Sequence, residues 1–332
     1  MLRAGLSALE VPYGLAVRRR NRWYDRHTDA AVAVGVPVVS VGNLTVGGTG
    51  KTPVVEWLVR WFAARDVRAG IVSRGYRSED GLANDEALEL AIKLPGTPHV
   101  QNPDRVAASR QIVEEHGCKA IVLDDGYQHR RIHRDVNIAL VDATAPFGYD
   151  RLLPRGLLRE PLAGLARADV VILTRADAIS PEEREAILRR LREYAPQAMW
   201  LEAAHQPKSL LAADGRRAEV ATLAGQPVAA FCGIGNPAGF RHTLEHAGLR
   251  VADFREFPDH YAYSTAAVAG LSAWANGTEV AAVVCTLKDL VKTRVTHLAR
   301  KPLWAVEIAV EFLGPTSLLE ERLAKLISPP PQ

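Results

Sequence analysis

The chain has 332 residues, of which 48% are apolar and 24% charged, a composition typical of folded globular proteins and unlike that of disordered chains, collagen-like repeats or membrane bundles. The formal net charge of +3 is far below that of a dedicated nucleic-acid binder, and residues 1–35 carry the whole excess, with six arginines against three acids. Three cysteines lie far apart in the sequence, which predicts buried thiols in a reducing compartment rather than disulfides or a zinc site.

Residues 1–35 are predicted to form an amphipathic N-terminal segment that associates with a membrane. Its apolar positions, at three- and four-residue steps, are Leu2, Leu6, Leu9 and Tyr13. The basic and aromatic positions behind them are Arg18, Arg19, Arg20, Arg22, Trp23 and Tyr24. This pattern is typical of a helix lying on anionic lipid, although such a helix can also pack on its own domain. No apolar run approaches the roughly 20 residues of a membrane span and no signal peptide is evident, so we expect an intracellular protein without a transmembrane span.

Apolar strands that alternate with helical patterns predict an α/β fold with two domains. The strands expected in the first domain, residues 36–210, are 36–41, 69–73, 120–124, 137–141 and 170–174. Each is apolar on both faces, as buried parallel strands are, which predicts a doubly wound sheet. A helix follows, with Ser180 and Glu183 as its capping residues.

A stretch rich in Pro, Ala and Gly comes next, and we take residues 211–225 as a linker. A second, smaller α/β domain is expected over 226–312, and a C-terminal helix and tail over 313–332. The elements expected there are strands near 228–232, 250–254, 280–286 and 303–310, and helices at 237–246, 265–275, 287–298 and 316–327. Two lobes of this kind usually hold a ligand in the cleft between them.

The strongest local signal is a glycine-rich turn between a buried strand and a helix. The residues predicted to bind nucleotide phosphates are Thr45, Gly47, Gly48, Thr49, Gly50, Lys51 and Thr52. Glycines let backbone N–H groups surround phosphate oxygens, Lys51 neutralises charge, and the Thr52 hydroxyl can hold Mg²⁺. Thr45 stands where the strict P-loop pattern has its first glycine. A glycine-rich turn without a nucleotide is the alternative interpretation.

A P-loop also needs a carboxylate for its metal, at the end of a neighbouring buried strand. Asp124 and Asp125 follow the apolar run 120–123 and meet this need. Adjacent acids are costly to bury unless they meet a cation, so we predict a metal role. Because neighbouring side chains point in different directions, one acid is expected to bind the metal directly and the other through water or a basic side chain.

Longer motifs make the chain resemble the tetraacyldisaccharide 4′-kinase family of P-loop kinases. They are residues 40–53 (SVGNLTVGGTGKTP), 73–76 (SRGY), 124–135 (DDGYQHRRIHRD), 141–148 (VDATAPFG), 152–161 (LLPRGLLREP) and 257–261 (FPDHY). The resemblance implies ATP- and Mg²⁺-dependent phosphorylation of the 4′-hydroxyl of tetraacyldisaccharide 1-phosphate, giving lipid IVA in lipid A biosynthesis. It also implies a lipid substrate, an anionic membrane surface as partner, and a peripheral place on the cytoplasmic face of the bacterial inner membrane. We expect a monomer that binds no nucleic acid.

The resemblance further assigns roles to single residues. Asp85 matches the family's catalytic base and His260 the histidine that pairs with it, while Asn84 replaces the usual glycine. The implied metal set is Thr52, Asp124, Asp125 and Glu160. Residues implied near substrate, phosphate or the transition state are Glu86, Arg105, Gln128, His129 and Arg159. Residues 286–289 (TLKD) resemble a family motif that we place near the nucleotide base. A purely structural role remains open for His129.

Two other functions compete with this interpretation. Residues 171–177 (VILTRAD) resemble the strand end with which P-loop GTPases read guanine, with Thr-Arg in place of Asn-Lys, so a GTPase or ATPase switch protein is the alternative function. A catalytically inactive binding module is disfavoured because Lys51, Thr52, Asp85 and Asp124 are all present.

Overall fold

The computed structural model describes residues 2–75 and 85–328, and its chain divides into two compact units. Unit 1 comprises Met1–Tyr76, Gly96–Ala204 and Phe312–Gln332, and unit 2 comprises Arg77–Pro95 and His205–Glu311. Asn84, which departs from the family motif, lies outside the described residues. No helix within 2–75 and 85–328 is both long and apolar enough to cross a bilayer.

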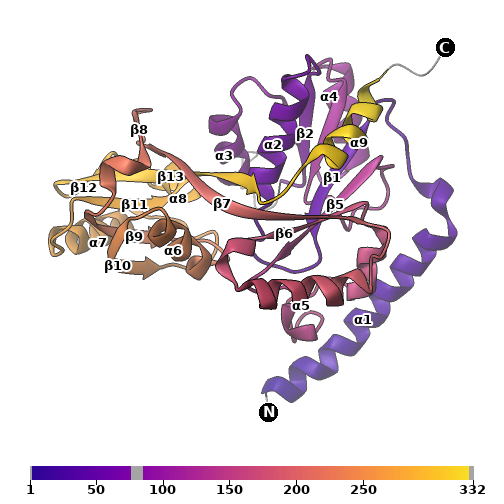
Figure 1. The fold of residues 1–332 in the computed structure, drawn as a ribbon, viewed down its shortest axis with the longest axis horizontal. Coiled ribbons are helices and arrows are strands. Elements are labelled where there is room, and N and C mark those ends of the chain that lie inside the picture. Colours follow the sequence, from indigo (N-terminus) through magenta and orange to yellow (C-terminus); the bar gives the residue numbers. More distant parts are fainter. Residues whose placement is uncertain (1, 76–84, 329–332) are drawn as a thin grey trace. The chain divides into compact units, whose positions relative to one another are not determined.

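Unit 1 is built on a parallel sheet. Its strands are β1 (Val38–Asn43), β2 (Ala69–Ser73), β3 (His99–Gln101), β4 (Ala120–Asp124), β5 (Val136–Asp142), β6 (Val170–Thr174) and the first part of β7 (Met199–Leu211). They are ordered β7-β6-β5-β1-β4-β2-β3 (Figure 1). Val39 of central β1 pairs with Val122 on one side and Val136 on the other. All residues of β2, β4 and β6 are buried, which is why their bounds match the predicted ranges.

Helices complete this doubly wound unit, and the α/β prediction is confirmed. They are α1 (Leu2–Arg26), α2 (Lys51–Ala63), α4 (Arg105–Glu114), α5 (Pro181–Arg192) and α9 (Ser317–Ile327), with short 3-10 turns η1 (Thr28–Ala30), η2 (Gly148–Asp150), η3 (Leu162–Arg167) and η4 (Ala176–Ala178). The predicted cap of α5 is present: Glu183 N donates to Ser180 Oγ at 3.2 Å, and Ser180 N donates to Glu183 Oε2 at 3.0 Å. Leu188 and Leu191 of α5 share a core cluster with β5 and β6 side chains.

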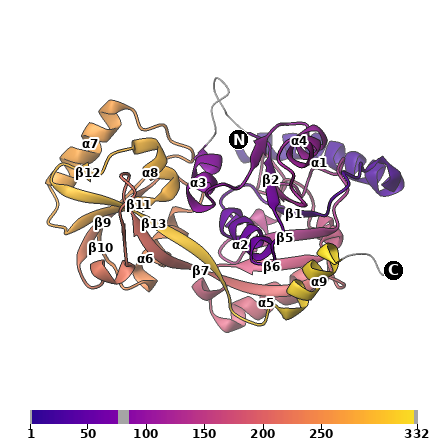
Figure 2. The same cartoon turned by 90° about the horizontal axis from the view of Figure 1, so that it is seen from above.

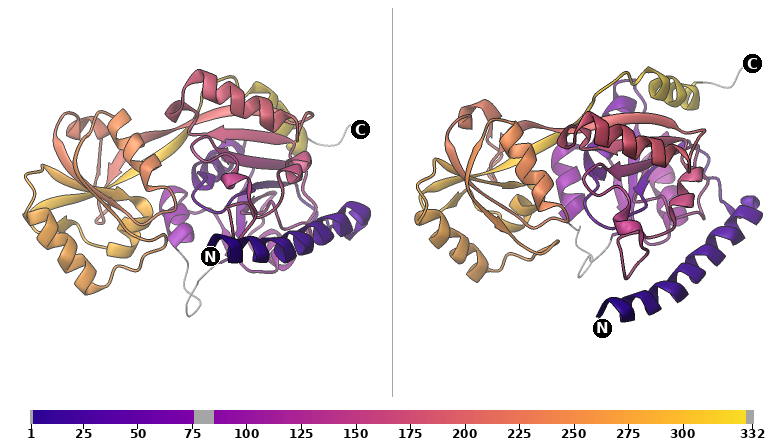
Figure 3. Two further views of the ribbon diagram at one scale, coloured as in Figure 1. Left: turned by 90° about the horizontal axis from the view of Figure 1, so that it is seen from below. Right: turned by 60° about the horizontal axis from the view of Figure 1, so that its bottom comes forward.

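Helix α1 lies at the surface of unit 1 and is fixed to it by polar contacts (Figure 3). Glu10 Oε1 accepts a hydrogen bond from Leu152 N at 2.9 Å, and the Tyr13 hydroxyl donates to the Arg159 carbonyl at 2.8 Å. Tyr13 therefore points into the protein. Its predicted place on the apolar side of the helix that contacts lipid is wrong. The large apolar side chains that α1 exposes are Leu9, Val11, Leu15 and Trp23. The helix thus packs on its own domain on one side and presents apolar side chains to solvent on the other.

Unit 2 is a smaller α/β layer structure. Its elements are α3 (Asp85–Lys93), the end of β7, β8 (Arg217–Ala218), η5 (Val220–Leu223), β9 (Pro227–Cys232), α6 (Pro237–His246), β10 (Arg250–Glu256), α7 (Thr265–Asn276), β11 (Ala282–Thr286), α8 (Leu287–Thr293), β12 (His297–Leu298) and most of β13 (Lys301–Phe312). The strands β10-β9-β11-β13 are parallel neighbours. Alternate residues of β9 pack on opposite faces: Phe231 with α7 and α8, and Ala230 with α6 (Figure 2).

The structure differs from the expected domains and elements in four places. The linker expected at 211–225 contains the last residue of β7, then β8 and η5, and unit 2 already begins at His205 inside β7. Strand β7 is half polar and was not expected; Ser209 in it donates to Glu307 at 2.6 Å. The segment 77–95, expected in the first domain, belongs to unit 2. Helix α8 ends at Thr293, because Arg294 adopts φ 54°, rather than at 298.

Candidate functional site

The glycine-rich loop joins β1 to α2 with the backbone that phosphate binding requires. Gly47 and Gly50 have φ values of 112° and 83°, which favour glycine strongly. Lys51 and Thr52 open α2, so the loop lies at a helix N-terminus, where N–H groups attract anions. Thr45 has no positive φ, and its carbonyl accepts from Asn43 Nδ2 at 2.7 Å. The first glycine of the strict pattern is therefore not needed at position 45.

Residues at the end of β6 hold this loop in place through hydrogen bonds to its backbone carbonyls. The Thr174 hydroxyl donates to the Thr49 carbonyl at 2.9 Å, and Arg175 Nη2 donates to the Gly48 carbonyl at 2.9 Å. Arg175 is 7% exposed and also forms an ion pair with Asp142. The Thr-Arg pair that suggested guanine recognition thus supports the phosphate loop in this structure.

Asp124 and Asp125 have different surroundings. Asp124 closes β4 opposite Val41 of β1 and is 3% exposed. Asp125 follows in the left-handed region with φ 52°, 3.5 Å from Lys51 Nζ and 2.8 Å from Arg159 Nη1. Burial alone would raise the pKa of Asp125, but Lys51 and Arg159 outweigh it and lower the pKa to about 2. The basic partner expected for one of the two acids belongs to Asp125.

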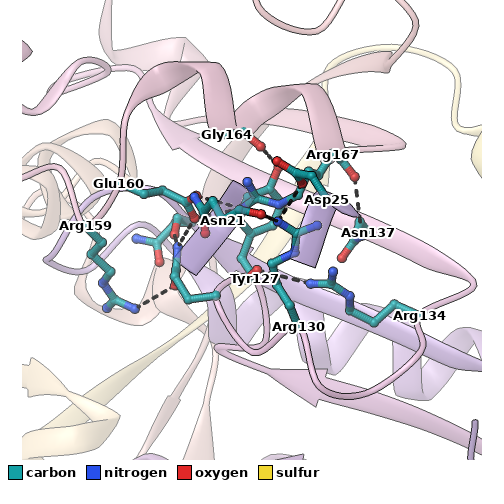
Figure 4. A network of polar contacts seen from close by, with 12 residues as sticks. Asn21, Asp25, Tyr127, Arg130, Arg134, Asn137, Arg159, Glu160, Gly164 and Arg167 are labelled. Atoms are coloured by element: carbon teal, nitrogen blue, oxygen red, sulfur yellow. Dashed lines mark hydrogen bonds and ion pairs between the residues drawn. The ribbon is translucent and has the colours of Figure 1, made fainter. Parts of the chain in front are cut away.

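Glu160 is the centre of a buried polar network (Figure 4). It is 0% exposed, and Arg167 Nη2 donates to both of its oxygens at 2.8 Å. Gln128 Nε2 donates to Oε1 at 3.0 Å, and Asn21 Nδ2 of α1 donates to Oε2 at 2.8 Å. Gln128 also donates to the Asn43 carbonyl at 2.8 Å, at the end of β1. Both carboxylate oxygens thus have protein donors, and a metal ion at Glu160 would have to displace one of them.

Arg105 and His129 are two further predicted site residues in unit 1, and Arg105 lies close enough to Asp124 and Asp125 to feel their charge. Arg105 is 3% exposed at the start of α4. Burial lowers its pKa, against the opposing influence of Asp125 and Asp124. Burial, reinforced by the positive charge of Arg105, lowers the pKa of His129 to about 4, so its imidazole is neutral at pH 7.

The predicted base and its histidine come together in unit 2. His260 Nδ1 lies 2.9 Å from Asp85 Oδ2, and the nitrogen must donate because an ionised carboxylate only accepts. Lys292 Nζ lies 3.0 Å from the same oxygen, and Lys288 Nζ lies 2.8 Å from Glu86 Oε1. Burial would raise the pKa of Asp85, but His260, Lys288 and Lys292 outweigh it and hold the pKa well below its usual range. The hydrogen bond to Asp85 raises the pKa of His260.

Sequence reasoning missed the two lysines of α8 as partners of Asp85 and Glu86. They are four residues apart and therefore lie on one face of a helix, which was a usable signal. Lys288 pairs with Glu86, and the place of the TLKD segment near the nucleotide base stays a prediction. Within the described part of the chain, no group of three or more His, Cys, Asp or Glu side chains could hold a metal ion.

Comparisons with known proteins agree over nearly the whole chain. A family model described as tetraacyldisaccharide-1-P 4′-kinase matches residues 2–328. A tetraacyldisaccharide 4′-kinase of Anaeromyxobacter sp. (strain K) is 39% identical over 350 residues, covering 99% of this chain and 92% of the relative. That of Syntrophus aciditrophicus (strain SB) is 36% identical over 311 residues, covering 86% and 83%. The crystal structure of LpxK from Aquifex aeolicus in complex with ATP is 30% identical, with a TM-score of 0.76, covering 99% of this chain and 100% of that one.

Proposed function

Because the chain belongs to the tetraacyldisaccharide 4′-kinase family, we infer that it transfers the γ-phosphoryl group of ATP to the 4′-hydroxyl of tetraacyldisaccharide 1-phosphate, giving lipid IVA in lipid A biosynthesis. The observation that carries this proposal is that the family match spans residues 2–328, and so includes both the phosphate loop and the Asp85–His260 pair. A GTPase function has less support, since Arg175 is buried against Asp142 and the loop backbone.

The phosphate loop serves the nucleotide in this proposal. Backbone N–H groups from Gly47 to Gly50 bind phosphate oxygens, and Lys51, now paired with Asp125, exchanges that carboxylate for phosphate. Arg159, which Asp125 also holds, stabilises charge on the transferred group.

The residues present fit a Mg²⁺ ion that is shared with the nucleotide. The Thr52 hydroxyl and the Asp124 carboxylate are hard oxygen donors, and Mg²⁺ typically takes one or two protein ligands plus phosphates and waters. When bound, Mg²⁺ neutralises negative charge on the phosphates during transfer. We assign direct binding to Thr52 and Asp124. Asp125 and Glu160, predicted as ligands, are assigned instead to holding Arg159 and Arg167, their present partners.

Asp85 acts as the acceptor of the hydroxyl proton. Its Oδ2 is held by His260 and Lys292, whereas Oδ1 receives longer bonds of 3.1 Å from Glu86 N and 3.2 Å from His260. We therefore assign Oδ1 to the sugar hydroxyl. A weakly basic carboxylate suffices, because phosphoryl transfer has a loose transition state in which positioning dominates over early proton removal. His260 fixes the orientation of the carboxylate and shares the proton after transfer.

The lipid substrate requires work at a membrane surface, for which α1 is suited. It exposes Leu9, Val11 and Leu15 to solvent, and the arginines at 18–20 and 22 are exposed as well. We propose that this face binds anionic lipid at the cytoplasmic side of the inner membrane, with each arginine near the surface contributing on the order of 1 kcal/mol. That the enzyme is a monomer stays a prediction.

Mass spectrometry of the lipid tests this function. After incubation with ATP, Mg²⁺ and tetraacyldisaccharide 1-phosphate, we expect the lipid to gain one phosphate. Lys51→Met should abolish that gain, and GTP should replace ATP poorly. A lipid of unchanged mass, or clear preference for GTP, would contradict the proposal.

A further inference from the structure

We propose that Lys292 is a positioning residue for the reaction, and that buried Asp289 holds both Lys292 and His260 in place against Asp85. The inference rests on the proposed role of Asp85 as proton acceptor. It gives a function to the TLKD segment, residues 286–289, and adds two residues to the site.

Asp289 ties three separate segments of unit 2 together. It is 0% exposed, and it accepts hydrogen bonds from the Thr286 hydroxyl at 2.6 Å, from the Tyr263 hydroxyl at 3.0 Å and from Gly233 N at 3.1 Å. These donors come from the start of α8, from the loop before α7 and from the end of β9. A buried carboxylate that loses a hydrogen-bond donor becomes much less stable, so Asp289 favours the arrangement in which all three donors reach it. It therefore fixes the relative positions of these three segments.

The loop that carries His260 depends on the same anchor. His260 N donates to the Gly233 carbonyl at 3.3 Å, so Gly233 links His260 through its carbonyl and Asp289 through its N–H. His260 itself has φ 60°, a conformation that a non-glycine residue keeps only when its surroundings hold it. A Cβ at position 233 would lie 3.2 Å from both Asp289 Oδ1 and the Pro258 carbonyl, which leaves little room there. Asp289 thus sets the place of the first partner of Asp85.

Lys292 follows Asp289 by three residues, so the two lie on neighbouring positions of one helix face. Its side chain is 15% exposed, with Nζ 3.0 Å from Asp85 Oδ2. Oδ2 has two partners, the ion pair with Lys292 from α8 and the hydrogen bond from His260 in the loop. Together they leave the carboxylate little freedom to rotate and keep Oδ1 available to a further donor, such as a substrate hydroxyl. The second partner of Asp85 therefore selects which carboxylate oxygen is offered to the substrate.

The charges around Asp85 make Lys292 more than a structural contact. The groups around the Asp85–His260 pair are Asp259 from the loop, which faces His260, Lys288 and Lys292 from α8, and Glu86 and Glu89 from α3. Lys288 is engaged by Glu86, which leaves Lys292 as the ammonium in contact with Asp85 itself. Removing the Lys292 charge should therefore change how strongly Asp85 acts on His260.

The test compares Lys292→Met, Lys292→Arg and the matched control Lys208→Met, which removes an exposed lysine charge elsewhere in unit 2. Steady-state kinetics should show kcat about 10- to 100-fold lower for Lys292→Met at an unchanged KM for ATP, because misplacing a reacting group costs this much. Lys292→Arg should recover part of that loss, and Lys208→Met should match wild type. Asp289→Asn should reproduce the kcat loss of Lys292→Met.

A spectroscopic measurement separates positioning from loss of structure. Imidazole ¹⁵N NMR should show the pKa of His260 higher in Lys292→Met than in wild type, because a neighbouring positive charge has gone and Asp85 acts on His260 undivided. An unchanged His260 pKa together with unchanged kcat would overturn the inference. If the pKa of His260 shifts in Lys292→Met but the wild-type protein phosphorylates no lipid, the proposed function is refuted while the Lys292–Asp85 contact stands.

Discussion

Replacing Asn21 with alanine tests how firmly α1 is joined to the phosphate site. The substitution removes the 2.8 Å hydrogen bond to Glu160, a carboxylate that is 0% exposed. A hydrogen bond to a charged group is worth about 1.5–3 kcal/mol, and since Asn21 is only half-buried the lower end applies. Helix undocking should then become easier by about 1.5 kcal/mol, which is roughly tenfold in its equilibrium constant. Tyr13→Phe, which loses a neutral bond to the Arg159 carbonyl, should show a smaller effect of about fivefold.

Amide hydrogen exchange measures this opening directly, since exchange from a locally open state reports its free energy. Amides of α1 near Val17, which is buried, should exchange roughly tenfold faster in Asn21→Ala, and amides of β4 should be unaffected. Leu15→Ala is the control, because that side chain is 60% exposed on the same helix. If Asn21→Ala and Leu15→Ala exchanged alike, the contact with Glu160 would not hold the helix and the reasoning would fail.

Three further predictions concern catalysis, membrane binding and pH. Asp85→Ala should lose lipid phosphorylation while keeping ATP affinity, measured by turnover and by titration with a fluorescent nucleotide; activity retained in this variant would refute its role as proton acceptor. Replacing Leu9 and Leu15 together with serine should weaken binding to anionic vesicles in a sedimentation assay but not nucleotide binding, and unchanged partitioning would count against the lipid-facing side of α1. Burial opposes ionisation of Asp125, but Lys51 and Arg159 outweigh burial and lower its pKa from 3.8 to about 2. The ion pairs of Asp125 therefore stabilise the fold fully above about pH 4, and this stabilisation is lost as the pH falls through about 2. Urea unfolding should therefore find Asp125→Asn less stable than wild type by about 1–2 kcal/mol at pH 7, a value reduced for the one-third exposure of the side chain, with the difference shrinking toward pH 2; a deficit that is independent of pH would contradict this ion-pair account.

The sequence allowed much of unit 1 to be predicted because burial and chemistry coincide there. Strands β2, β4 and β6 are buried along their whole length, so their apolar runs mark their ends to the residue. The phosphate loop is legible because glycine, lysine and threonine are required at fixed steps between a strand and a helix. Asp124 and Asp125 follow the same logic, as acids that end a buried strand.

Contacts between segments that are distant in the sequence could not be predicted in this way. Asp85 contacts Lys292 because α3 packs on α8 within unit 2. The sequence around residue 85 does not indicate that this segment belongs to unit 2. Strand β7 mixes polar and apolar residues without regular alternation and contains Pro207, so its composition resembles that of a linker. The inward turn of Tyr13 depends on the Arg159 carbonyl, which lies 146 positions away in the sequence. Helical spacing alone cannot choose between two faces of a helix when both carry apolar residues.

The most direct test of the account is the position of the new phosphate on the lipid product. Phosphorus–proton correlation NMR of the product formed from ATP and tetraacyldisaccharide 1-phosphate should show the added phosphorus coupled to H-4′ of the glucosamine disaccharide. One ADP should form for each phosphate gained. Phosphorus on any other hydroxyl, or ADP formation without a phosphorylated lipid, would contradict the assignment of this chain as a 4′-kinase.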